Sequence, residues 1–139
     1  MSQMLTVQVE QVGPATARAT ARSHAVTVDR PVGKGGEDKG PLGGEYLLVA
    51  LGGCFMSNLL AAIRAREAAV SNLRIDVTGT IDGTPDHFTA FTMNVSASHA
   101  DASLARKLIA IAARACAVTN TLRHAATVTI EFEGAAVDH

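Results

Sequence analysis

The segment Tyr46–Ile63 constrains the fold more than any other part of the sequence, because it contains no charged side chain. Its length approaches the roughly 18–20 residues of a membrane span. It also contains a glycine pair, Ser57 and Asn58, and it is followed at once by Arg64. We therefore interpret it as a helix buried in a protein core, and we expect no membrane association.

The residues around this segment extend the predicted helix from Glu45 to about Val70, because strong helix formers dominate there. At 1.5 Å per residue such a helix would be roughly 35–40 Å long, which exceeds the width of a small domain. Either the pair Gly52–Gly53 kinks it, or it crosses a subunit boundary. Its first half is apolar almost all round, which predicts burial on all sides.

The first thirty residues predict strands. Apolar and polar residues alternate with period two in Leu5–Val9, Thr16–Ala21 and His24–Asp29, which predicts three short strands in a meander or hairpins. The following segment, Gly33–Gly44, contains six glycines. Its spacing fits neither a phosphate-binding loop nor a dinucleotide fingerprint, so we interpret it as a flexible connector or lid.

Two further strands and a second helix are expected after the long helix. Leu73–Ile81 and His87–Ser96 alternate around a turn at 83–86, and Asp101–Ser103 resembles the start of a helix. A last strand is expected over Thr127–Glu133. The order βββ-α-ββ-α-β segregates helices from antiparallel strand pairs, so the fold class is α+β and residues 1–139 form a single domain.

Composition narrows the functional classes. The chain has 139 residues, a hydrophobic fraction of 47%, a net charge of −1 and only 4% aromatic residues. The chain therefore has enough apolar residues to bury a hydrophobic core. A nucleic-acid-binding surface would need an excess of basic residues or stacking aromatic residues, and the composition argues against both. The N-terminus lacks the basic and apolar regions of a secretory signal, which predicts a cytoplasmic protein with reduced thiols. The cysteines and histidines are not clustered at ligand spacing, so we expect neither a metal nor an organic cofactor.

Cys54 and Cys116 are the residues most suited to covalent or redox chemistry. Cys54 falls inside the long predicted helix and Cys116 near the end of the second helix, and both are expected to point inward. Buried cysteines are commonly structural, so structural and reactive roles both stay open. A hydrolytic pair of Cys54 with His24 also stays open, although it has no local signature.

A reactive cysteine needs a neighbour that stabilises its thiolate. Arg18, Arg22 and Arg30 are candidate cations, and Glu45 could orient such an arginine. Glu45 precedes Cys54 by nine residues, which is about 180° around an unbroken helix. It could therefore reach the same pocket only if it belongs to the loop or if the glycine pair breaks the helix.

Three segments resemble the osmotically inducible protein C and organic hydroperoxide resistance superfamily (OsmC/Ohr). They are the entry segment from Arg22 to Pro41, with Val28-Asp29-x-Pro31; the first cysteine motif, Glu45–Cys54; and a second, Cys116-Ala117-Val118 with Thr121-Leu122. The second motif has Ala117 where the family usually has proline. Gly43-Gly44 precedes Glu45, where the hydroperoxide-resistance branch has a proline. The sequence therefore looks closer to the less-characterised, OsmC-like branches.

The resemblance implies antiparallel sheets wrapped around long buried helices in an intertwined homodimer with active sites at the interface. It also implies a thiol-dependent peroxidase in which Cys54 is the peroxidatic thiolate and Cys116 the resolving thiol. Arg22 or Arg18 would then support the thiolate, together with Glu45. A dithiol would be the reductant, which in the best-known branch of the family is a lipoylated protein.

The leading hypothesis is therefore reduction of organic hydroperoxides, with bulky apolar hydroperoxides preferred because Cys54 lies in an apolar helix. The alternative is a non-catalytic dimeric protein that binds a small apolar ligand and whose cysteines are structural. A hot-dog-type thioesterase also wraps a sheet around a long helix. It is disfavoured by three strands before the helix and by the lack of a carboxylate near the helix midpoint.

Overall fold

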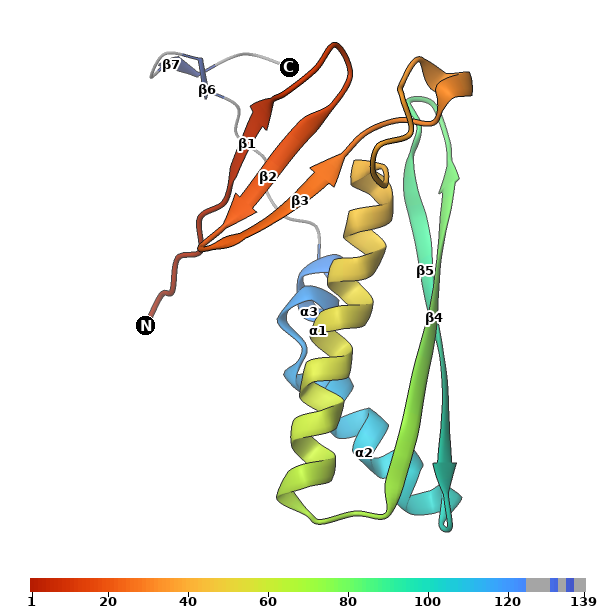
Figure 1. Ribbon diagram of the computed structural model, residues 1–139. Coiled ribbons are helices and arrows are strands. Elements are labelled where there is room, and N and C mark those ends of the chain that lie inside the picture. The colour runs from red at the N-terminus through yellow and green to blue at the C-terminus, as the bar shows by residue number, and fades with distance from the viewer. Residues whose placement is uncertain (125–130, 133–134, 137–139) are drawn as a thin grey trace. The chain divides into compact units, whose positions relative to one another are not determined.

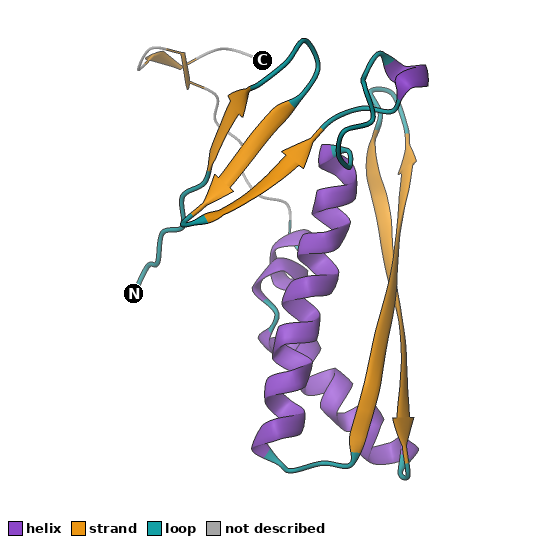
Figure 2. Cartoon of the chain, in the orientation of Figure 1, coloured by secondary structure: helices purple, strands orange, loops and turns teal. Residues whose placement is uncertain are grey.

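The computed structural model describes residues 1–124, 131–132 and 135–136 (Figures 1 and 2). Over these residues the predicted α+β class is confirmed, with one additional short helix in the second half. The contacts group into two compact units, residues 1–49 and 50–139, and the boundary falls inside the long helix. The single domain expected from the sequence stays a prediction.

The N-terminal unit begins with the expected meander. Strands β1 (Gln8–Gln11), β2 (Ala17–Ala21) and β3 (His24–Val28) pair antiparallel in the order β1-β2-β3. The β2–β3 register runs from the pair Ala17 and Val28 to the pair Ala21 and His24. The intervening turn needs one residue at positive φ, and Arg22 adopts it with φ 55°. The period-two alternation thus predicted these strands to within a few residues.

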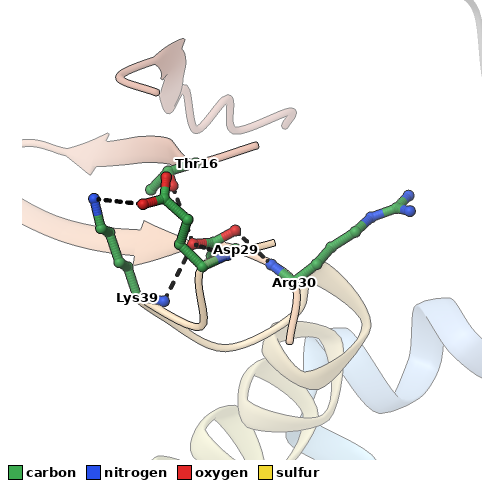
Figure 3. A network of polar contacts seen from close by, with 5 residues as sticks. Thr16, Asp29, Arg30 and Lys39 are labelled. Carbon is green, nitrogen blue, oxygen red and sulfur yellow. Dashed lines mark hydrogen bonds and ion pairs between the residues drawn. The ribbon is translucent and has the colours of Figure 1, made fainter. Parts of the chain in front are cut away.

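Asp29, directly after β3, anchors the glycine-rich segment that follows (Figure 3). Its carboxylate is buried and accepts hydrogen bonds from the Thr16 hydroxyl at 3.0 Å and from the backbone N–H groups of Arg30 at 2.7 Å, Glu37 at 3.4 Å and Lys39 at 3.1 Å. Burial raises the pKa of Asp29, and these four donors lower it further than burial raises it, to below its ordinary value of 3.8.

The connector between β3 and the long helix is therefore a hydrogen-bonded loop and not the flexible segment that its composition predicts. It contains the short 3-10 helix η1 (Val32–Lys34). A Cβ on Gly36 would collide with the carbonyl group of Arg30, so glycine is required where the loop folds back. Tyr46 then fixes the start of the next helix, because its hydroxyl donates to the Thr27 carbonyl at 2.7 Å.

Helix α1 (Gly43–Ala65) is continuous through Gly52 and Gly53, so the glycine pair does not break it. Its buried residues are spaced every three or four positions and so occupy one face: Leu51, Phe55, Leu59 and Ala62. The prediction of burial on all sides is wrong for the single chain, in which Val49 remains 62% exposed and Leu60 46% exposed. The first half is uniformly apolar, but one chain supplies a partner for only one face.

The same helix is long and apolar enough to cross a membrane by length and composition alone, with a mean hydropathy of 1.9 and a third of its most apolar window buried. Phe55, Leu59 and Ala62 pack instead into a core with Leu108 and Ala112. These contacts agree with the interpretation of this segment as a core helix.

The second unit contains a long antiparallel ribbon of β4 (Val70–Asp82) and β5 (His87–His99), joined at the predicted turn (Figure 2). Helix α2 (Ala102–Ala115) follows, and Asp101 caps it by accepting from the N–H groups of Ser103 and Leu104. Alternate ribbon side chains, including Leu73, Ile75, Met93 and Val95, pack against the helical core. The ribbon and the helices thus share one hydrophobic core in this unit.

The end of the chain differs from the prediction. The second helix ends at Ala115, and a further helix, α3 (Ala117–Arg123), begins after Cys116. Of the expected strand Thr127–Glu133, only residues 131–132 lie within the described residues; they form β6 (Glu131–Phe132), which pairs with β7 (Ala135–Ala136).

Candidate active site

Cys54 lies in the middle of α1 and is partly exposed. Asn58, one turn further on, donates its side-chain amide to the Cys54 carbonyl at 2.9 Å, and the same nitrogen lies 3.8 Å from Cys54 Sγ. Thiols accept hydrogen bonds weakly, whereas a thiolate accepts strongly. Asn58 is therefore placed to orient the sulfur of Cys54.

Cys116 occupies the junction between α2 and α3 and is fully buried. Its backbone is extended, with φ −78° and ψ 109°, so the chain leaves one helix and enters the next at this residue. Its sulfur takes the place that a serine or aspartate oxygen usually fills at a helix start, and it accepts the N–H of Thr119 at 3.4 Å. The sequence predicts Cys116 near the end of the second helix, and the structure has it directly after that helix, where its sulfur caps a further helix that was not predicted.

The two cysteines, distant in the sequence, share one core and are both free thiols. Burial raises the pKa of Cys116. The side chain and the N–H of Thr119, the side chain of Cys54 and the N–H of Val118 together lower that pKa by more than burial raises it. The structure thus brings together the predicted thiol pair, and the more deeply buried thiol of the two has its thiolate form favoured.

The other three predicted site residues belong to the N-terminal unit. Arg18, on β2, forms an exposed ion pair with Glu10 at 3.8 Å, and Arg22 is exposed in the β2–β3 turn. Glu45 is exposed in the first turn of α1, where its carboxylate accepts the N–H of Leu42 at 2.8 Å. That bond satisfies a backbone donor at the helix start. The role of these residues at the thiolate stays a prediction.

A cavity of about 340 Å³ lies within the second unit, and it is lined by neighbours of the cysteines but by neither cysteine itself. Thr119, which hydrogen-bonds Cys116, lines it, and so does Leu51, which precedes Cys54 by less than one helical turn. Its other apolar walls include Phe91, Met93 and Leu122, and Arg123 is also at its wall. The cavity is therefore mainly apolar, with a hydroxyl and a guanidinium group among its polar groups.

Sequence reasoning missed Asn58 and Thr119. Both had a readable signal: Asn58 follows Cys54 by four residues, which is the spacing of neighbours on one helix face. Thr119 follows Cys116 by three residues, which is the spacing between a capping residue and the N–H it satisfies. Among the described residues, no three His, Cys, Asp or Glu side chains lie close enough together to hold a metal ion.

Comparison with known proteins places this geometry in a family. The model of the OsmC-like protein family matches residues 36–131, which is more than half of the chain and includes both cysteines. The chain belongs to the OsmC-like protein family. None of the curated proteins compared with it matches.

Solved structures show the same OsmC-like fold at low sequence identity. An OsmC-like protein from Mycoplasma pneumoniae superposes with a TM-score of 0.78 at 18% identity, covering 89% of this chain and 90% of that one. A putative organic hydroperoxide resistance protein from Vibrio cholerae, with captopril bound in one of its active sites, has a TM-score of 0.65 at 18% identity. It covers 99% of this chain and 97% of its own.

A third similar structure is an organic hydroperoxide resistance protein from Elizabethkingia anophelis with bound thiocyanate, with a TM-score of 0.65 at 18% identity. The match covers 89% of this chain and 92% of that one. The recognition of the OsmC/Ohr superfamily from the cysteine motifs is thus confirmed.

Proposed function

We propose that this OsmC-like protein is a thiol peroxidase that reduces organic hydroperoxides to alcohols and so takes part in defence against oxidative stress. The observation that carries the proposal is the convergence of two free thiols, Cys54 and Cys116, in one core. The hydroperoxide resistance proteins among the similar structures support the same class of chemistry.

The exposure of the two thiols favours Cys54 as the one that meets peroxide. Cys54 is partly exposed, whereas Cys116 is fully buried. The Cys54 thiolate attacks the terminal peroxide oxygen, the O–O bond breaks, and the leaving alkoxide takes a proton to become the alcohol. Cys54 is thereby oxidised to a sulfenic acid.

Cys116 then resolves this intermediate. Its sulfur attacks the Cys54 sulfenic acid, an S–S bond forms, and water leaves. Stabilisation of the Cys116 thiolate by its hydrogen-bond donors favours this step, since the thiolate is the attacking species. An external dithiol then reduces the disulfide and returns both thiols.

The cavity beside Thr119 supports a preference for bulky apolar substrates. Its volume of about 340 Å³ exceeds what hydrogen peroxide needs, and its walls include Leu51, Phe91 and Met93. Apolar side chains of the hydroperoxide would gain burial there, whereas hydrogen peroxide would not.

Two expectations from the sequence belong to the same proposal. A homodimer would cover the apolar side chains that the single chain leaves exposed on α1, Val49 and Leu60 among them. A cytoplasmic location would keep both cysteines reduced between turnovers.

The test treats the reduced protein with cumene hydroperoxide, counts free thiols, and searches for a Cys54–Cys116 disulfide by mass spectrometry. We expect two thiols lost per chain and one peroxide consumed. Cys54→Ser should consume none, and Cys116→Ser should stop at a sulfenic acid that dimedone traps. Persistence of both thiols with untouched peroxide, or full activity of Cys54→Ser, would refute the proposal.

A second candidate function is the binding of a small apolar ligand, with the cysteines in a structural role. A cavity of about 500 Å³ favours it, because Leu73, Val95 and Ile109 are among its lining residues, whereas Thr119, the hydrogen-bond partner of Cys116, is not. A fluorescent apolar probe that binds the Cys54→Ser/Cys116→Ser double variant as tightly as wild type would support this candidate, provided that wild type is inert toward peroxide.

A further inference from the structure

Thr119 has an unusual place beside Cys116. Its side chain is buried, with 8% exposure, and among the described residues its hydroxyl oxygen has no hydrogen-bond partner. Its N–H donates to Cys116 Sγ at 3.4 Å. Buried hydroxyl groups are nearly always satisfied, so one left without a partner next to a reactive sulfur calls for an explanation.

The explanation lies in the ionisation state of the sulfur. A neutral thiol is a weak acceptor, whereas a thiolate is a strong one, and a hydroxyl hydrogen can rotate toward its acceptor. The Thr119 side chain is already among the groups that lower the pKa of Cys116. The hydroxyl therefore gains its partner when Cys116 carries negative charge.

The other groups that lower the pKa of Cys116, the Cys54 side chain and the Val118 N–H, do so less than the side chain and the N–H of Thr119. The core around it consists of apolar side chains, including Phe55, Leu108 and Ala112, and Cys54 is the titratable member of that cluster. Arg123 lines the cavity that Thr119 also lines, but it is an exposed residue at the end of α3. Thr119 thus donates its N–H to this sulfur and holds, beside it, a buried hydroxyl group that is available as a second donor.

Cys116 carries negative charge as a leaving group when its disulfide with Cys54 is reduced. We propose that an external dithiol attacks Cys54 Sγ of the disulfide and that Thr119 stabilises the departing Cys116 thiolate, which makes Thr119 a positioning residue that sets the direction of reduction. The inference rests on the disulfide of the proposed function.

The step balances as ordinary thiol–disulfide exchange. One thiolate of the dithiol forms an S–S bond to Cys54, the Cys54–Cys116 bond breaks, and its electron pair stays on Cys116. The second thiol of the reductant then attacks the mixed disulfide and releases Cys54, so the reductant ends as its own disulfide. The partial exposure of Cys54 and the complete burial of Cys116 favour the same direction.

The test separates reduction from peroxide chemistry, because diamide forms the disulfide without any peroxide. Wild type, Thr119→Val and Thr119→Ser are oxidised with diamide, and their reduction by dithiothreitol is followed as the return of free thiols. Thr119→Val keeps the shape but loses the hydroxyl, so we expect reduction to slow roughly threefold for each unit by which the pKa of the leaving thiol rises, taking a Brønsted sensitivity of about 0.5. Thr119→Ser should reduce at nearly the wild-type rate.

Two further measurements make the outcome specific. In the Cys54→Ser background, the pH midpoint of thiolate ultraviolet absorbance reports Cys116 alone, and Thr119→Val should raise it while Thr119→Ser should not. In oxidised wild type, a monothiol pulse stopped by acid should leave a mixed disulfide on Cys54. A mixed disulfide on Cys116, or an unchanged rate and midpoint in Thr119→Val, would overturn the inference even if peroxide is reduced.

Discussion

A Cβ added to Gly52 of α1 would lie 2.8 Å from Cγ2 of Val77 on β4, which is closer than Cβ atoms approach other atoms in real structures. Glycine therefore allows the helix to lie against the ribbon at this point. The next residue, Gly53, has no atom within 4 Å of the same position, apart from its own helix and neighbours. Of these two adjacent glycines, only Gly52 is required by close packing within the described residues.

We predict that Gly52→Ala destabilises the protein and that Gly53→Ala does not. Overpacking typically costs about 1–3 kcal/mol, and over most of that range the cost exceeds the roughly 1 kcal/mol that alanine gains over glycine in a helix. At Gly53 only the gain applies. Urea denaturation of both variants measures the difference. Equal free energies of unfolding for the two variants would show that Val77 yields without cost.

The pH dependence of the N-terminal unit should reflect Asp29. The pKa of this carboxyl is lowered in the folded state, so its ionised form stabilises the fold above its ordinary value of 3.8, and this stability is lost as the pH falls through the folded pKa. We expect Asp29→Asn to be less stable than wild type at neutral pH and to lose less stability between about pH 6 and about pH 3.

Tyr46 offers a local probe for this measurement, because it is the one tyrosine in a chain without tryptophan, and its hydroxyl is bonded to Thr27 within the same unit. Near-ultraviolet circular dichroism of Tyr46 during acid titration should therefore report the unit. Asp38→Asn, an exposed carboxyl on the same loop, is the matched control and should follow the wild-type profile.

Loss of the Asp101 side chain that caps α2 should lower the free energy of unfolding by a moderate amount. The Asp101 carboxylate accepts from the N–H groups of Ser103 at 3.0 Å and Leu104 at 3.2 Å. Asp101→Ala should lower the free energy of unfolding by about 1 kcal/mol, and Asp101→Asn should recover most of it, because asparagine caps nearly as well. The exposed Ser103→Ala is the control. A loss in that control equal to the loss in Asp101→Ala would assign the effect to the first turn as a whole.

Several of these features could be predicted from the sequence because their causes are local. Period-two alternation located the meander and the ribbon, and Asp101 was recognised as a helix start from its residue type and position. The two cysteine motifs were sufficient for the family, which the match over residues 36–131 confirms.

Other features depend on contacts that no local pattern encodes. Cysteine is an uncommon helix cap, so nothing in the residue type announced that Cys116 would end α2 and begin α3. Composition suggested a flexible loop at 33–44, because it cannot show that Asp29 accepts two backbone donors, the N–H groups of Glu37 and Lys39, from that region. The prediction that α1 is buried on all sides was wrong for the single chain. An apolar surface indicates that something covers it, but the sequence does not show that the covering residues belong to the same chain.

Substrate size should be set by the cavity beside Thr119. Ala90 of β5 lines this cavity, so Ala90→Leu would place a larger side chain at its wall. We expect turnover of cumene hydroperoxide to fall by about tenfold or more, on the scale of one methylene in an apolar pocket, while turnover of hydrogen peroxide changes little. Thr92→Leu, exposed two residues further along β5, is the matched control. Parallel assays with the two peroxides give the ratio directly, and an equal loss for both would show that the cavity does not hold the substrate.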